Sequence, residues 1–150
     1  DMTSPAYVAR NKYPAYHPNT FLHPVGYGTL GYALPAAIGA KLANDEKEVA
    51  VLIGDGGFQF TLPELGVLLE NKISLPIIIW NNDGFGEIRK NELKRHSSET
   101  IAVNHENPDF KKLADSYNLF YSQVEKTANL ESIVRKAFER ENSQIIEVKE

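Results

Sequence analysis

Two short apolar runs, at residues 49–53 and 76–80, stand out in the middle of the chain. Both are rich in β-branched residues and nearly free of polar positions, which is typical of parallel strands that helices cover on both faces. Each run ends in glycine and polar residues, GDGG at 54–57 and NNDG at 81–84. Because crossovers between parallel strands are right-handed, we expect both ends at one edge of the sheet, where open α/β sheets bind ligands.

Helical patterns separate and follow these runs. Thr61, Pro63 and Glu64 predict a helix start, with Thr61 as N-cap, Pro63 in the first turn and Glu64 closing a capping box. Asn107 and Pro108 predict another start, with Asn107 as N-cap and Pro108 at the first helical position. Further helices are predicted at 33–42, 87–96 and 127–141, and further strands at 119–124 and 144–148.

The remaining segments have weaker patterns. Residues 1–20 are rich in Pro, Tyr and Asn and predict irregular structure, while Pro24 makes residues 21–25 a short edge strand at best. The polar residues 97–106 predict a loop. The alternation of strands and helices therefore predicts one α/β domain at 1–150, with a doubly wound, mostly parallel sheet and helices on both faces.

Composition narrows the classes of function and partner. A chain of 150 residues is large enough for one domain with its own core, and a formal net charge of −4 without a basic tract argues against nucleic acid and anionic membranes as partners. The absence of cysteine excludes disulfides and thiolate metal sites and fits a cytoplasmic protein. The chain begins at Asp1 and its only methionine is Met2, so we expect a fragment of a longer protein or one piece of a split one.

The two polar strand ends offer oxygen ligands close together. The Asp55 carboxylate, an asparagine side chain of NNDG and a backbone carbonyl form a hard ligand set that suits Mg²⁺ or Ca²⁺, and Mg²⁺ completes its shell with water and phosphate oxygens. The glycines around Asp55 let backbone N–H groups approach an anion. These residues indicate a magnesium–diphosphate site; the alternative is a tight turn at GDGG and a plain loop at NND.

The histidines offer no comparable signal. None is spaced like a metal pair, and the chain has no convincing Ser/His/Asp nucleophile pattern. We therefore interpret all four as surface or loop residues: His17, His23, His96 and His105.

Two longer motifs resemble a known family. GDG at 54–56, followed by Asn81 and Asn82, resembles the thiamine diphosphate signature of the acetolactate synthase and pyruvate decarboxylase superfamily. Upstream, residues 26–40 (GYGTLGYALPAAIGA) resemble the segment of the same enzymes that holds the pyrimidine ring of the cofactor. The resemblance covers nearly the whole chain and matches the C-terminal, diphosphate-binding domain of the family. It implies thiamine diphosphate and Mg²⁺ as cofactors.

The resemblance also implies roles for individual residues. Asp55 and Asn82 match the side-chain ligands of Mg²⁺, and Gly84 matches the residue that supplies a backbone carbonyl to the metal. Backbone N–H groups after Asp55 match those that bind the diphosphate. The candidate cofactor contacts are Thr3, Ser4, Gly28, Thr29, Leu30, Gly54, Asp55, Gly56, Gly57, Phe58, Asn82, Gly84, Phe85 and Gly86.

Leu30 is the catalytic candidate. It matches the apolar wedge that bends the cofactor, so that the pyrimidine amino group lies next to the reactive carbon of the thiazolium ring. The Gly28 carbonyl and the Leu30 amide match backbone groups that bind the pyrimidine edge. The alternative for Leu30 is a plain core leucine, and for Thr3 and Ser4 a solvated terminal segment.

The family builds its active site between domains, which implies partners for this chain. The cofactor is activated by a glutamate on an N-terminal pyrimidine-binding domain, usually from a neighbouring subunit, and nothing in this chain matches that domain. We therefore expect half an active site, inactive alone, within a homodimer or homotetramer that acts on a 2-oxo acid. Small residues in the predicted helix at 33–42 suit close packing on a neighbour: Ala36, Ala37, Gly39 and Ala40.

The reaction is indicated by NNDGFGEIR at 81–89, which resembles synthase-type decarboxylases of basic 2-oxo acids, such as 5-guanidino-2-oxopentanoate decarboxylase. Glu87 is the substrate candidate, because a carboxylate suits a guanidinium tail; the alternative is that Glu87 only favours a helix N-terminus. The leading hypothesis is an acetolactate synthase-like decarboxylase or carboligase, a lyase or transferase. The alternatives are a non-catalytic cofactor-binding or assembly domain and an unrelated phosphate-binding α/β domain.

Overall fold

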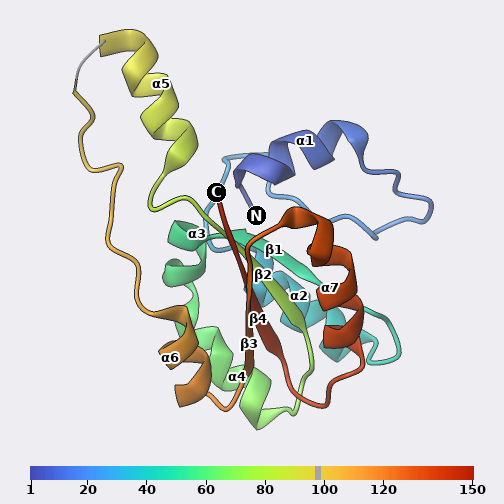
Figure 1. Cartoon of the computed structure of the whole chain (residues 1–150). Helices are drawn as coiled ribbons and strands as arrows, with labels where there is room; N and C mark the ends of the chain where they lie inside the picture. The colour runs from blue at the N-terminus through green and yellow to red at the C-terminus, as the bar shows by residue number, and fades with distance from the viewer. Residues whose placement is uncertain (97–98) are drawn as a thin grey trace.

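The computed structural model describes residues 1–96 and 99–150, and its strands form one parallel sheet (Figure 1). All three strand pairs are parallel, and the register sets Ile77 between Val51 and Ile145. The predicted α/β fold with a parallel sheet is therefore confirmed. In the spatial order β1-β2-β4-β3, the strands are β1 (Val51–Gly54), β2 (Pro76–Asn81), β4 (Gln144–Lys149) and β3 (Phe120–Val124).

Helices pack on both faces of the sheet because side chains along each strand alternate between the two faces. Ile77 and Ile79 of β2 are fully buried in the larger apolar cluster, where each contributes about 1.5–3 kcal/mol of hydrophobic stabilisation. Ile78 and Trp80 belong to a second cluster against α7 (Leu130–Phe138). The larger cluster takes side chains from α2 (Ala33–Ala43), α3 (Asp55–Phe60), α4 (Leu65–Glu70) and α6 (Phe110–Ser116).

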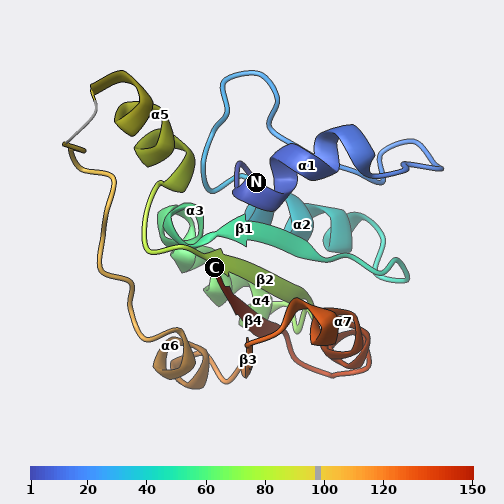
Figure 2. The ribbon, with the colours of Figure 1, turned by 45° about the horizontal axis from the view of Figure 1, so that its top comes forward.

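The predicted helix at 127–141 is shorter than expected. Residues Thr127–Asn129 form a 3₁₀ turn (η2), and the α-helix α7 begins at Leu130 and ends at Phe138. Ile133, Val134 and Ala137 recur at helical spacing and pack on Ile146 and Val148 of β4. Figure 2 shows β3 between α6 and α7.

The N-terminal prediction of irregular structure at 1–20 is wrong over its first half. A helix, α1 (Ser4–Lys12), forms there because Pro5 suits the first helical turn and Ala6 is buried. The Pro, Tyr and Asn residues that indicated irregular structure lie mostly at 13–20, which has no helix or strand. Residues 21–25 also form no strand; Leu22 and Val25 are exposed there, and Pro24 has no N–H for pairing.

The helix between β1 and β2 starts earlier than predicted. It begins as α3 at Asp55, directly after β1, because Phe58 reaches the core and contacts Phe110 edge-on. The capping box is wrong: Thr61 makes no side-chain cap, and Leu62–Glu64 form a 3₁₀ turn (η1) before α4. The Thr61 hydroxyl is buried and has no hydrogen-bond partner among the described residues.

The predicted cap at Asn107 is also wrong. Asp109 is the N-cap of α6, and its carboxylate accepts a hydrogen bond from the Lys112 N–H at 3.0 Å. The Asn107 side chain turns instead toward the carboxyl ends of β1 and β2. In the predicted loop at 97–106, residues 97–98 lie outside the described residues, and 99–106 hold only an isolated bridge from Asn104 to Gly84.

Helices α2 and α5 (Gly86–His96) agree with the predicted 33–42 and 87–96. The small residues of α2 do not share one face: Ala37 is buried in the core of this domain, whereas Gly39 is exposed with open space around it. A close neighbour could therefore meet Gly39 and not Ala37. Within residues 1–96 and 99–150, no helix has the length and apolar character needed to cross a membrane.

Candidate functional site

The carboxyl ends of β1 and β2 meet at a cavity of about 380 Å³. Asp55 follows β1 and is only 1% exposed, and the N–H of Gly84, in the loop after β2, donates to its carboxylate at 3.0 Å. The cavity wall is shared by thirteen of the residues singled out from the sequence, which are Thr3, Ser4, Gly28, Leu30, Gly54, Asp55, Gly56, Gly57, Asn82, Gly84, Phe85, Gly86 and Glu87.

Two of the predicted contacts lie off this wall. Thr29 is exposed and does not line the cavity. Phe58 is fully buried in the core and does not line the cavity either. Leu30, in contrast, is partly buried on the cavity wall and is not a member of either buried cluster, which disfavours the plain-core alternative.

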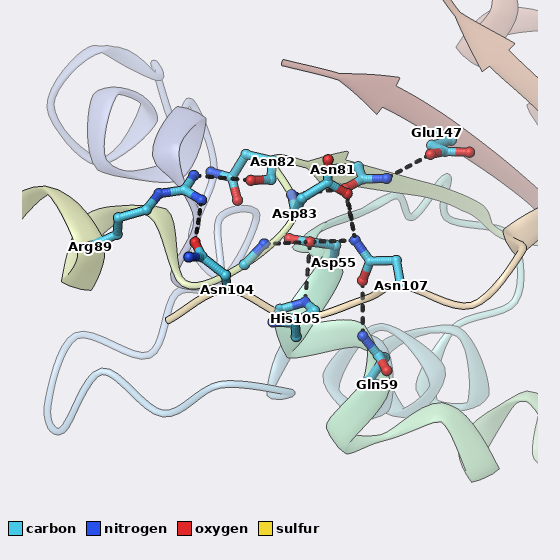
Figure 3. A network of polar contacts seen from close by, with 11 residues as sticks. Asp55, Gln59, Asn81, Asn82, Asp83, Arg89, Asn104, His105, Asn107 and Glu147 are labelled. Atoms are coloured by element: carbon cyan, nitrogen blue, oxygen red, sulfur yellow. Dashed lines mark hydrogen bonds and ion pairs between the residues drawn. The ribbon is translucent and has the colours of Figure 1, made fainter. Parts of the chain in front are cut away.

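The Asp55 carboxylate uses its two oxygens differently (Figure 3). Oδ2 accepts from the Gly84 N–H at 3.0 Å and from the Asn107 side-chain amide at 2.7 Å. Nε2 of His105 lies 3.3 Å from the same oxygen without hydrogen-bond geometry. Among the described residues, no side chain or backbone group donates to Oδ1. One oxygen is thus held in place while the other remains for a cation, which prefers such hard ligands.

The two neighbouring asparagines point in different directions. Asn81 is buried, with its amide donating to Glu147 at 2.7 Å and its oxygen accepting from the Asp83 N–H at 3.1 Å. Asn82 lies against Gly86, where an added Cβ would come within 2.4 Å of its side-chain nitrogen. The Asn82 side chain makes no hydrogen bond to another described residue. It is the asparagine that can turn its oxygen to a ligand in the cavity.

The loop after β2 is shaped by Gly84. Its φ of +148° is one that glycine adopts readily, and a Cβ there would lie 2.1 Å from the Val103 carbonyl oxygen. The same carbonyl accepts from the Phe85 N–H at 2.8 Å. Arg89 adds two bonds, to the Asn82 carbonyl at 3.0 Å and to the Asn104 side chain at 2.8 Å. Residues 103–107 therefore hold this loop against the cavity.

The N-terminal segment holds the opposite wall. The Asp1 carboxylate is 5% exposed and accepts from the Gly31 N–H at 2.7 Å, which places the glycine-rich loop that carries Leu30. Gly28 adopts a φ of +68° and packs near Met2. The Thr3 side chain lies beside Gly54, so the terminal segment is part of the wall and not merely solvated.

Glu87 lies in the first turn of α5 and lines the cavity, and its side chain is 42% exposed. The ammonium group of Lys90 lies 4.0 Å from its carboxylate. The position is compatible with both sequence-based roles, since Glu87 lines the cavity and also lies in the first turn of a helix.

The donor set fits magnesium and a diphosphate better than a transition metal. Within the described residues, no three His, Cys, Asp or Glu side chains are grouped to hold a metal. A single carboxylate with amide and carbonyl oxygens is the kind of set that Mg²⁺ accepts, because it keeps waters and phosphate oxygens in its shell. The first N–H groups of α3 receive no side-chain cap and face the same strand end.

Sequence analysis missed three residues that build this site. Asp1, His105 and Asn107 reach it through tertiary contacts, and none lies in the glycine-rich or NNDG motifs. The sequence carried no signal for them, because His105 and Asn107 lie in a polar stretch after α5 whose position relative to the sheet is not set by local pattern.

Open α/β domains bind their cofactors in cavities at the carboxyl edge of the parallel sheet. The parallel sheet and the cavity at its carboxyl edge therefore place this chain in the class of cofactor-binding α/β domains. Sequence comparison identifies the particular family. Residues 1–148 match the family model described as "Thiamine pyrophosphate enzyme, C-terminal TPP binding domain", so the chain belongs to that family.

Several relatives cover almost the whole chain. The probable 2-ketoarginine decarboxylase AruI of Pseudomonas aeruginosa is 40% identical over 150 residues, covering 99% of this chain and 27% of the relative. Acetolactate synthase of Bacillus subtilis is 33% identical over 148 residues, covering 99% of this chain and 26% of the relative. The chain thus spans about a quarter of the length of these relatives.

A solved structure agrees with the family assignment. The thiamine diphosphate-dependent 4-hydroxybenzoylformate decarboxylase of Rhodococcus jostii RHA1 is similar with a TM-score of 0.73 and 32% sequence identity. The similarity covers 81% of this chain and 23% of that protein. The chain is therefore similar to one domain of longer thiamine diphosphate enzymes.

Proposed function

We propose that this chain binds thiamine diphosphate and Mg²⁺ as the diphosphate-binding half of the active site of a 2-oxo acid decarboxylase or carboligase. The observation that carries the proposal is the Asp55 carboxylate, held through one oxygen and free at the other on the wall of the cavity that Leu30 also lines. The family match over residues 1–148 supports the same cofactor.

Each wall of the cavity has a role in this proposal. Asp55, Asn82 and the Gly84 carbonyl hold Mg²⁺, while the N–H groups of Gly56 and Gly57 bind the diphosphate. Thiamine diphosphate, when bound, supplies a nucleophilic carbon and an electron sink for the loss of CO₂ from a 2-oxo acid. The remaining residues of the wall position the cofactor or close the cavity, and they are Thr3, Ser4, Gly28, Gly54, Phe85 and Gly86.

Leu30 orients the cofactor in this proposal. Its branched apolar side chain would hold the bound cofactor in the bent form that favours deprotonation of the reactive carbon. The Gly28 carbonyl and the Leu30 N–H bind the edge of the pyrimidine. Positioning of this kind is worth several kcal/mol of the activation barrier, on the order of what intramolecular reactions gain.

The substrate that the site supports best is a 2-oxo acid with a guanidino tail, such as 5-guanidino-2-oxopentanoate. Glu87 lies on the cavity wall with a partly exposed carboxylate, which suits a guanidinium group. The 40% identical relative bears the name 2-ketoarginine decarboxylase, which supports the same substrate. A carboligase of the acetolactate synthase type is the second candidate, favoured by the 33% identity to the Bacillus subtilis enzyme.

The rest of the enzyme belongs to the proposal, because the chain spans about a quarter of these relatives. We infer an N-terminal pyrimidine-binding domain that brings the activating glutamate, within a homodimer or homotetramer. A non-catalytic binding or assembly domain is the alternative. It would bind thiamine diphosphate and Mg²⁺ in the complete protein without turnover of any 2-oxo acid.

Replacement of Asp55 by Ala tests the site. In the complete protein, Asp55→Ala should weaken Mg²⁺-dependent binding of thiamine diphosphate by a factor on the order of a hundred or more, because only neutral oxygens remain for the cation. Calorimetric titration with and without Mg²⁺ measures the effect.

Asp115→Ala is the matched control, since Asp115 is an exposed aspartate of α6 that carries the same charge and does not line the cavity. The control variant should bind thiamine diphosphate in the presence of Mg²⁺ with an affinity close to that of the wild type. Equal affinity of Asp55→Ala and wild type would refute the metal assignment.

A further inference from the structure

Asn107 occupies a position between three oxygens at the carboxyl edge of the sheet. Its side-chain nitrogen donates to Asp55 Oδ2 at 2.7 Å and to Asn81 Oδ1 at 2.9 Å, and Asp83 Oδ1 lies at 3.3 Å (Figure 3). The bond to Asp55 is charge-assisted, so it is roughly twice as strong as a bond between neutral groups. Asn107 thereby joins the strand ends of β1 and β2 although it belongs to neither.

The orientation of this amide is fixed from the other side. The exposed Gln59 of α3 donates to the Asn107 oxygen at 2.9 Å, which leaves the nitrogen facing the three acceptor oxygens. A flipped amide would turn its oxygen toward Asp55 and Asn81 and lose all of these bonds. The Gln59 contact and the Asp55 contact therefore select the same orientation.

Contacts behind Asn81 fix the orientation of its side-chain amide, whose oxygen accepts from Asn107. The buried Glu147 of β4 accepts from the Asn81 amide at 2.7 Å and from the Tyr121 hydroxyl of β3. Burial and the neighbouring Glu147 raise the pKa of Tyr121 well above its ordinary value, so the phenol remains a donor. Because the Asn81 nitrogen is used by Glu147, its oxygen must face Asn107. The hydrogen bonds run without a break from β3 through β4 and β2 to Asp55.

We propose that Asn107, backed by Asn81 and Glu147, is a positioning residue that holds Asp55 Oδ2 so that Oδ1 is presented to Mg²⁺. This inference rests on the proposed function, since it assigns Asp55 to the metal. A helix cap cannot explain the side chain, because Asp109 already caps α6. Partners that orient a metal ligand typically contribute 10- to 100-fold in metal affinity, and one hydrogen bond suggests the lower end, about tenfold.

The test compares Asn107→Ala with Gln59→Ala in the complete protein. Both variants remove the contact between Asn107 and Gln59, but only Asn107→Ala removes the donor to Asp55. Thiamine diphosphate is titrated calorimetrically at a series of Mg²⁺ concentrations. We expect Asn107→Ala to raise the half-saturating Mg²⁺ concentration about tenfold, with near-normal cofactor affinity at excess Mg²⁺, and Gln59→Ala to stay within about twofold of wild type.

Four results would overturn the inference. A half-saturating Mg²⁺ concentration unchanged in Asn107→Ala would remove the positioning role. Weaker binding at every Mg²⁺ concentration, or an equal effect of Gln59→Ala, would mean that Asn107 only anchors the loop. Failure of the wild type to bind with Mg²⁺ would refute the proposed function itself, and the inference with it. Melting curves confirm that the variants are folded.

Discussion

In the proposed function, the choice of substrate depends on Glu87. This residue lines the cavity, but 42% of its side chain is exposed and Lys90 competes for its carboxylate at 4.0 Å. Exposed ion pairs are weak, whereas a partly desolvated guanidinium–carboxylate pair reaches about 1.5–3 kcal/mol. The exposure of Glu87 favours the lower end of that range, which corresponds to about tenfold in specificity.

Glu87→Gln should therefore lower kcat/KM for 5-guanidino-2-oxopentanoate about tenfold in the complete enzyme and leave pyruvate little changed. The reason is that the isosteric amide keeps the shape of the side chain and loses only the charge. Steady-state rates of CO₂ release on the two substrates measure it. Equal losses on both substrates would assign Glu87 to architecture, and no loss on either would leave it as a helix-start residue.

Some residues of the site were predictable from the chain and others were not. Asp55 and Gly84 lie in short motifs directly after apolar runs, and the edge at which parallel strands end is set by topology, so local pattern was sufficient. Asn107 is 52 residues from its partner Asp55 and carried a local signal for a helix cap. That signal was misleading because Asp109, two residues later, makes a charge-assisted bond to the Lys112 N–H.

Among the elements, α6 depends most on a single capping residue. The backbone N–H of Lys112 lowers the pKa of the Asp109 carboxyl below its ordinary value of 3.8, with the neighbouring Lys112 side chain acting in the same direction. Because the pKa of Asp109 is lower in the folded chain than in the unfolded chain, the charged cap stabilises the fold at pH values above the unfolded-state pKa. This contribution disappears as the pH falls through the folded-state pKa. Helix α6 also follows the segment that carries Asn107.

Asp109→Ala should lower the melting temperature at neutral pH, because the first turn of α6 loses its cap. Asp109→Asn should retain most of the stability at neutral pH, since asparagine caps about as well as aspartate. On acidification from neutral pH to values below 3.8, the melting temperature of Asp109→Asn should fall less than that of the wild type, because asparagine has no charge to lose. Thermal melts over that range measure both. If the melting temperatures of the wild type and Asp109→Asn fell equally with pH, the role assigned to the charge would be contradicted.

Local sequence also explains why elements were predicted unevenly. The strands and α7 are buried on one or both faces, so their apolar periodicity follows directly from packing. Helix α1 has no such stripe, since only Ala6 is buried, and its stability comes from tertiary placement against the cavity wall. The start of α3 at Asp55 was hidden because two glycines, poor helix formers, occupy its first turn.

For the whole molecule, the cavity is incomplete on one side. Tyr27 and Ile88 line it and remain exposed, Tyr27 completely and Ile88 by 51%. Exposed apolar side chains around a ligand cavity are typical of a surface that another domain covers. This agrees with relatives that are about four times longer than the matched segment.

The purified 150-residue chain should therefore release no CO₂ from pyruvate or 5-guanidino-2-oxopentanoate and should bind thiamine diphosphate far more weakly than the complete protein. In the proposed function, the activating glutamate and the second wall that excludes water come from the rest of the protein. A coupled assay for CO₂, with calorimetry on both forms, measures these differences. Steady turnover by the isolated chain would show that a catalytic group has been overlooked within it.

The strand order has a consequence for how the chain assembles during synthesis. Strand β4 comes after every other strand in the sequence, yet it lies between β2 and β3. Until it has left the ribosome, β2 and β3 each present an unpaired edge, and Glu147 cannot yet orient Asn81. A nascent chain halted before Gln144 would hold both glycine-rich motifs and still lack the contact between Glu147 and Asn81, so under the proposed function we expect cofactor binding only after translation has passed this strand.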